Sequence, residues 1–202
     1  MSTTLLFKSE AARLAAAQPW TTQLLILAVF GVALPFLKGL DFFDPLILGA
    51  YTCLGAVFAP PAASSGFVIP SRAGAEVRIA VCVAYGELMA LGMTLLGVAT
   101  VYFSHLGGPF FPPALDALLE SAVFGFLLTI ALSTMAVWLT LRYSPGIAKL
   151  ALRLVFLALL AWFFLRGRSV FFAFVLQNSL VALAAGIVFW IALRSSTRPE
   201  SG

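Results

Sequence analysis

Charged residues are scarce in this sequence, and their scarcity decides the class of protein. Only 10% of the 202 residues are charged, whereas 62% are hydrophobic and the mean hydropathy is +1.06. A soluble domain is about a quarter charged and about half apolar, so this chain has too few charges to cover a surface that faces water. Its long apolar runs instead predict an all-α integral membrane protein in contact with the lipid bilayer.

Histidine and cysteine are almost absent. The chain has one histidine and two cysteines, which excludes a dense metal centre or a disulfide framework, and we expect no cofactor. His105 stands alone in a predicted loop. Cys53 and Cys82 are predicted to differ by about 12 Å in membrane depth, which is beyond the reach of a disulfide.

Common catalytic motifs are missing as well. The sequence has no Walker motif, no dinucleotide-binding glycine fingerprint and neither the G-x-S-x-G nor the H-E-x-x-H pattern of hydrolases. The segments between the apolar runs are too short to build a soluble catalytic domain. We therefore expect no enzyme. An intramembrane enzyme, for which Glu87 is the one candidate catalytic group, is the least favoured interpretation.

The basic residues give the chain a net charge of +4 and a pI near 9.4. They are scattered in ones and twos at the ends of apolar runs. This pattern is typical of signals that orient membrane helices, and it differs from the contiguous basic stripe of a phosphate-binding surface. We expect no nucleic-acid partner.

Six apolar segments, each bounded by polar or turn-forming residues, predict a bundle of about six transmembrane helices within residues 20–194. The expected spans are 21–37, 45–61, 79–103, 114–141, 147–165 and 169–193. The second is short: its apolar part would be about 22 Å long against a hydrocarbon core of about 30 Å. It either continues irregularly or is a broken helix. The polar residues 195–202 are expected to form a disordered cytoplasmic tail.

The N-terminal segment, residues 1–19, mixes Lys8, Glu10 and Arg13 with leucines and alanines. A short cytoplasmic helix lying at the membrane surface fits this composition, and a disordered tail is the alternative. The following apolar run is long for a cleavable signal and ends without a small-residue cleavage site, so we expect it to stay in the protein as the first span.

Six spans place both termini on one side of the membrane. The terminal side would then carry nine lysines and arginines (positions 8, 13, 72, 78, 142, 149, 153, 194 and 198), against three on the other (38, 166 and 168). The excess predicts cytoplasmic termini, in a bacterial inner membrane. If the fifth run, which contains Lys149 and Arg153, lies on the surface instead, the chain has five spans and its tail lies outside.

Glu87 is the most informative single residue. It follows Arg78 by nine residues, which places it about 13 Å into the membrane, where an ionisable group is costly and marks a candidate functional site. Gln177 and Asn178 are predicted to lie near the same depth from the opposite edge, so we expect a polar contact between the third and sixth spans. This intramembrane polar site is either a structural clamp or part of a transport or proton-relay path. Tolerance of Glu87→Gln separates the two.

Small and hydroxyl residues add weaker signals. Small residues four positions apart, which let helices approach closely, occur in two predicted spans: Gly86 with Ala90, and Ala182 with Gly186. They favour packing within the subunit over dimerisation. Thr129, Ser133 and Thr134 form a polar patch on the fourth span; satisfying their own helix backbone is favoured over lining a path.

The polar segment from Pro60 to Arg78 separates the second and third spans, and it contains Arg72, Gly74 and Glu76 in close succession. With the N-terminal helix and the six-span layout, this segment resembles the membrane subunits of ABC-2 type transporters. In that family a cytoplasmic element at this place, often with Arg, Gly and Glu, contacts the ATPase subunit. The chain differs in its short length, its tighter Arg-to-Glu spacing and the near absence of a loop between spans five and six.

The resemblance implies a transport permease subunit without its own ATPase site. Residues 62–78, with Arg72, Gly74, Glu76 and Arg78, would couple it to a cytoplasmic nucleotide-binding ATPase, and it would form a homodimer or hetero-oligomer because six spans rarely enclose a path alone. The alternative is a non-catalytic structural or assembly subunit of a larger membrane complex, in which 62–78 is a simple loop. Loss of function on substitution in that segment favours the first hypothesis, and indifference favours the second.

Overall fold

A computed structural model describes residues 3–17, 20–33, 72–104, 115–166 and 175–196. All regular structure in these ranges is helical, as the sequence predicts: α1 (Thr3–Ala17), α2 (Trp20–Ala28), the π-helical turn η1 (Val29–Ala33), α6 (Arg72–Ser104), α7 (Leu115–Arg142), α8 (Pro145–Arg166) and α10 (Val175–Ser196). Three helical segments are long and apolar enough to cross a membrane: Gly74–Leu96, Ala122–Arg142 and Asn178–Ser196. The chain is therefore a membrane-embedded, multi-pass α-helical protein.

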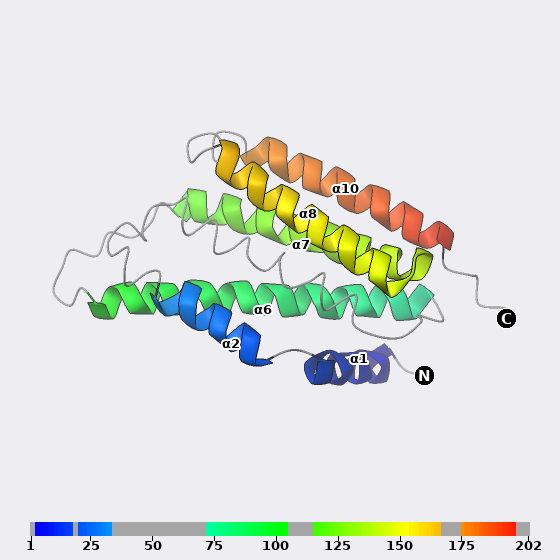
Figure 1. The fold of residues 1–202 in the computed structure, drawn as a ribbon, viewed down its shortest axis with the longest axis horizontal. Helices are drawn as coiled ribbons and strands as arrows, with labels where there is room; N and C mark the ends of the chain where they lie inside the picture. The colour runs from blue at the N-terminus through cyan, green and yellow to red at the C-terminus, as the bar shows by residue number, and fades with distance from the viewer. Residues whose placement is uncertain (1–2, 18–19, 34–71, 105–114, 167–174, 197–202) are drawn as a thin grey trace.

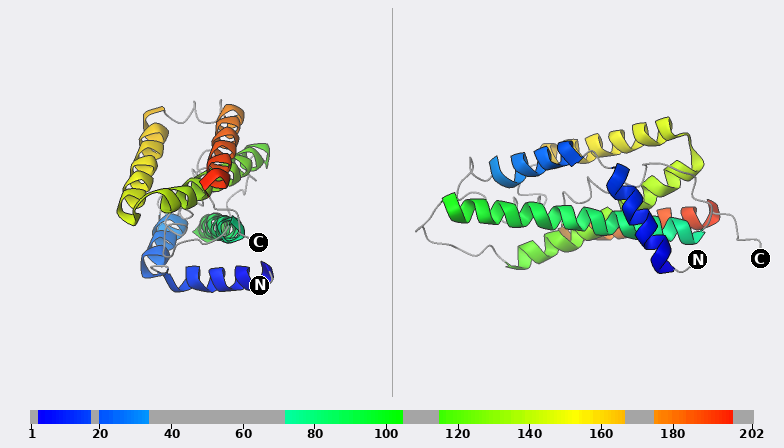
Figure 2. Two further views of the ribbon diagram at one scale, coloured as in Figure 1. Left: turned by 90° about the vertical axis from the view of Figure 1, so that its right-hand side faces the viewer. Right: turned by 90° about the horizontal axis from the view of Figure 1, so that it is seen from below.

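The helix α7 lies at the centre of the described bundle (Figure 1). It packs against α6, α8 and, most extensively, α10. The direction of the ribbon shows that α6 and α8 run antiparallel to α7, whereas α10 runs parallel to it. The end-on view in Figure 2 places α6 and α10 on different sides of α7. α7 is thus the element through which the other long helices are joined.

Small residues explain how α10 comes so close to α7. A Cβ atom added to Gly186 would lie 3.8 Å from the Cα of Ala131, and Ala182, one turn earlier, is buried. Residues 131–137 of α7 are all buried. The small-residue pair on α10 therefore packs within the chain, as the sequence predicts.

The first elements pack along α6. α1 crosses the beginning of α6 at a steep angle, whereas α2 and η1 run beside it (Figure 2). Leu14 of α1 is buried in the core, and Tyr85 of α6 donates a hydrogen bond to the Oε1 atom of Gln23 on α2. The N-terminal segment is a helix, so the alternative of a disordered tail is wrong for residues 3–17.

Most helix boundaries lie near the predicted ones. α7 and α8 agree with spans 114–141 and 147–165 within two residues. Only Tyr143 and Ser144 separate them. The amide of Ala148 donates to the carbonyl of Ser144 over 3.0 Å, and Pro145 occupies the first helical position, where its missing N–H costs nothing.

Two boundaries differ. α6 begins at Arg72, seven residues before the predicted third span, so 72–78 belongs to a helix. α10 continues through Ser195 and Ser196, which were expected in the disordered tail. The second span, 45–61, lies outside the described residues, and the count of six spans stays a prediction.

Candidate functional site

Three buried polar atoms have no hydrogen-bond partner in the part of the chain that the structure describes. They are Oε1 of Glu87, Oγ of Ser133 and Nδ2 of Asn178. Buried polar atoms are almost always paired, so each exception needs an explanation. All three lie within the membrane-spanning segments, where no bulk water is present to satisfy them. These atoms therefore mark the candidate site.

Glu87 lies at the interface between α6 and α7. Its carboxyl group is within hydrogen-bonding reach of the Thr129 hydroxyl on α7. Thr129 is fully buried, and its hydroxyl donates to the carbonyl of Gly125 over 2.7 Å. Ser133 follows Thr129 by four residues, which places both hydroxyls on the same face of α7, one turn apart. The site therefore consists of one carboxyl group and two buried hydroxyls.

The hydroxyl patch divides as follows. Thr129 and Thr134 donate to the carbonyls four residues earlier, Thr134 to Ile130 over 2.8 Å. This confirms the expected role of satisfying their own helix. Ser133 makes no such bond, although it is fully buried. It is the member of the patch that keeps an unused donor.

The predicted amide partners of Glu87 are placed differently from one another. The structure gives the backbone of Gln177 but no description of its side chain, whereas Asn178 lies in the first turn of α10. Asn178 precedes Gly186 by eight residues on a helix parallel to α7, so it lies about 12 Å along the axis from the Gly186–Ala131 contact. Thr129 is only about 3 Å from that level. The structure joins Glu87 to Thr129, and a contact with the amides stays a prediction.

The predicted coupling residues form the first two turns of α6. Gly74 and Glu76 are partly exposed, and the side chain of Arg72 is outside the described set. Arg78 is only 4% exposed. Its Nε atom donates to Oε1 of Glu10 on α1 over 2.6 Å. Arg78 thus connects the predicted coupling segment to the N-terminal helix.

Glu10 holds two arginines at once. Besides Arg78, it accepts bonds from Nε and the terminal NH2 nitrogen of Arg13, at 3.0 and 2.6 Å. Burial alone would raise the pKa of Glu10, but the hydrogen bonds and charges of Arg13 and Arg78 outweigh it and hold that pKa below its usual value. The sequence identified Arg78 as a functional candidate without indicating Glu10 as its partner.

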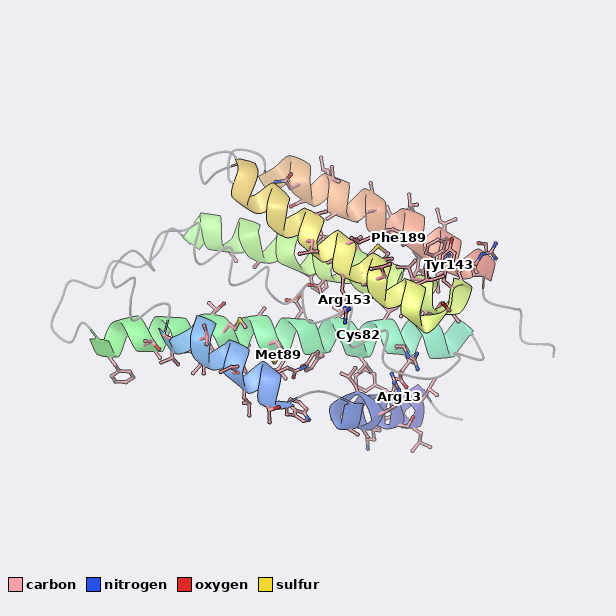
Figure 3. All side chains as sticks on the ribbon, in the orientation of Figure 1. Arg13, Cys82, Met89, Tyr143, Arg153 and Phe189 are labelled. Carbon is pink, nitrogen blue, oxygen red and sulfur yellow. The ribbon has the colours of Figure 1, made fainter. Side chains whose placement is uncertain are left out.

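Basic and aromatic residues gather at one end of the bundle. The start of α6, the end of α7, the start of α8 and the end of α10 meet there, close to α1 (Figure 1). Arg194 lies 5.5 Å from the ring centre of Trp190, and Trp138 packs edge-on against Tyr143. Tyr143 and Phe189 appear together at this end in Figure 3. Such a belt is typical of a membrane–water interface.

No protein-family model, curated protein or solved structure matches this chain. Within the described residues, no group of three His, Cys, Asp or Glu side chains could hold a metal ion. The functional argument therefore rests on the two polar clusters, Glu87–Thr129–Ser133 and Glu10–Arg13–Arg78.

Proposed function

We propose that this chain is the membrane subunit of a transporter, similar to the ABC-2 type permeases, and that residues 62–78 couple it to a cytoplasmic ATPase. The observation that supports this best is the ion pair between Glu10 and Arg78. It ties α1 to the helix that begins in the predicted coupling segment and carries Glu87 in its middle. A partner that moves the start of α6 would therefore move α1 and the membrane-buried carboxyl group with it.

The proposed arrangement in the membrane follows from the distribution of charge. The end with the basic and aromatic belt faces the cytoplasm of a bacterial inner membrane, α1 lies at its surface, and six helices cross the bilayer. α8 extends along the bundle beside α7 (Figure 1), and its 22 residues would reach about 33 Å, enough to cross. A second subunit completes the translocation path.

Purification from the native cell in mild detergent, followed by mass spectrometry of the associated proteins, tests the coupling. We expect a stoichiometric nucleotide-binding ATPase that is lost when Arg72 and Glu76 are changed to alanine. Arg166→Ala, a basic residue at the other end of the bundle, is the matched control and should keep the ATPase. Size-exclusion profiles establish that the variants are folded. A wild-type preparation without any ATPase contradicts the proposal.

A structural or assembly subunit is the second candidate, and two observations favour it. Arg78 is buried and paired inside the chain, as expected of a residue with a structural role. α10 also exposes a row of aliphatic side chains: Leu180, Val181, Leu183, Ile187, Val188 and Ile191. In this case other membrane subunits copurify, and substitutions at Arg72 and Glu76 leave their association unchanged.

A further inference from the structure

The hydrogen bonds of Thr129 determine which atom carries the proton at Glu87. A threonine hydroxyl has one hydrogen to donate. That hydrogen is used in the 2.7 Å bond to the carbonyl of Gly125, because a carbonyl oxygen can only accept. In its contact with Glu87, Thr129 is therefore limited to accepting. The carboxyl group must be the donor, which requires it to be a carboxylic acid in this arrangement.

We propose that Glu87 is a reversible proton-binding site between α6 and α7, with Thr129 and Ser133 as its positioning residues. Thr129 accepts the hydrogen bond of the neutral acid. Ser133 has an unused donor one turn away on the same face of α7, and Glu87 has an oxygen without a partner. When the carboxyl group loses its proton, rotation of the Ser133 hydroxyl supplies a bond to the carboxylate. The site thus has a separate partner for each protonation state.

The surroundings offer no positive charge that would keep a carboxylate ionised. α6 packs against α7, η1 and α1, and η1 has no charged residue. The charged residues of the other elements lie at least nine positions away along the helices, about 13 Å: Arg78 on α6, Lys8, Glu10 and Arg13 on α1, and Asp116, Glu120 and Arg142 on α7. Cys82 and Tyr85 are nearer but lie on the opposite side of α6.

The ligand is a proton and not a metal ion. Hard cations take about six or more oxygen ligands, whereas the described site offers one carboxyl group and two hydroxyls. One of these hydroxyls already donates to its own helix. The step is a simple exchange: a proton from the aqueous phase forms an O–H bond on the carboxylate, and release breaks the same bond. Because an ATP-driven permease does not require this exchange, the inference goes beyond the proposed function and does not depend on it.

Labelling with dicyclohexylcarbodiimide tests the site. This reagent adds to protonated carboxyl groups in apolar surroundings and leaves ionised ones unmodified. We expect the purified full chain, in detergent, to be labelled at Glu87 near neutral pH, as read by peptide mass spectrometry, with labelling that falls as the pH rises. Glu87→Gln should lose the label. A Glu87 that stays unlabelled, or is labelled equally at every pH, overturns the proposal.

Variants of α7 separate a proton site from a structural contact. Ser133→Ala removes the donor to the carboxylate, so the pH at which labelling is half lost should rise by about one unit. Thr134→Val, which removes a buried hydroxyl that is already bonded to its own helix, should leave that pH unchanged. Infrared difference spectra of wild type and Glu87→Gln, following the C=O stretch of a carboxylic acid, measure the same transition without a reagent. Equal shifts in both α7 variants would contradict the role of Ser133.

Discussion

Glu10 shows how one residue can hold two helices together. It accepts hydrogen bonds from Arg13 on its own helix and from Arg78 on α6. The side chain of Arg78 is 5% exposed, whereas that of Arg13 is 21% exposed. Removing one partner of a buried pair leaves an uncompensated charge, which costs far more than losing an exposed pair. The two arginines are therefore unequal in their contribution to stability.

Substitution of Glu10 tests this inequality. Glu10→Ala should lower the free energy of unfolding by about 3 kcal/mol because Arg78 stays buried without a partner. Arg13→Ala should cost at most about 1 kcal/mol. The double variant Glu10→Ala with Arg78→Met should regain most of the loss, as measured by unfolding in detergent. Equal effects of Glu10→Ala and Arg13→Ala would show that the pair with Arg78 adds nothing.

The attachment of α1 should also depend on acidity. Because the pKa of Glu10 is lowered in the folded state, its contribution is complete at neutral pH. It begins to fall below about pH 4.3, the ordinary value of a glutamate, and is lost as the pH passes through the lowered folded value. Hydrogen exchange of the α1 amides, corrected for the intrinsic effect of pH, should show the loss. Glu10→Gln should abolish this acid dependence.

The environment of Glu87 could be only partly predicted at the residue scale. Counting from Arg78 identifies Glu87 as a polar group deep in a span, and it identifies the amides near the start of the sixth span. Such counting estimates depth along a helix. It does not determine which neighbour a side chain faces, because that depends on how α6 is rotated against α7. Thr129 and Ser133 were recognised as a polar patch, but their proximity to Glu87 depends on tertiary packing.

At the scale of elements, the contact between α7 and α10 depends on the absence of a side chain. Gly186→Ala should be tolerated, since the added Cβ would lie at 3.8 Å, an ordinary van der Waals distance. Gly186→Leu should displace α10 and lower the unfolding temperature. Gly92→Leu is the matched control, because a Cβ there meets nothing within 4 Å. Equal destabilisation by both leucines would contradict the close approach.

The elements themselves were predictable where the signals are local. The turn between α7 and α8 is marked by Ser144 and Pro145, and both helices lie where the sequence places them. The beginning of α6 was not predictable, because polar residues before a span suggest a loop. The 2.6 Å bond from Arg78 to Glu10 allows that polar segment to be helical, and it joins residues 68 positions apart.

At the scale of the whole molecule, one end of the bundle collects α1 and the turn between α7 and α8 (Figure 1). Cysteines introduced by Ser9→Cys and Ser144→Cys should therefore react with an impermeant maleimide from the same side of sealed vesicles, the cytoplasmic side. Cys53 and Cys82 are first replaced by alanine. Phe103→Cys, near the other end of α6, is the control and should react only from the opposite side. Reaction of Ser9→Cys and Ser144→Cys from different sides contradicts the arrangement.

The parallel arrangement of α7 and α10 has a consequence for biogenesis. The extensive neighbour of α7 is separated from it by the whole of α8, so a ribosome completes α7 and α8 before it makes α10. During that interval the small-residue face around Ala131 lacks the glycine-bearing helix that later covers it. The central helix pair therefore assembles only late in translation. Chains that stop after α8 should leave this face open to membrane chaperones and proteases.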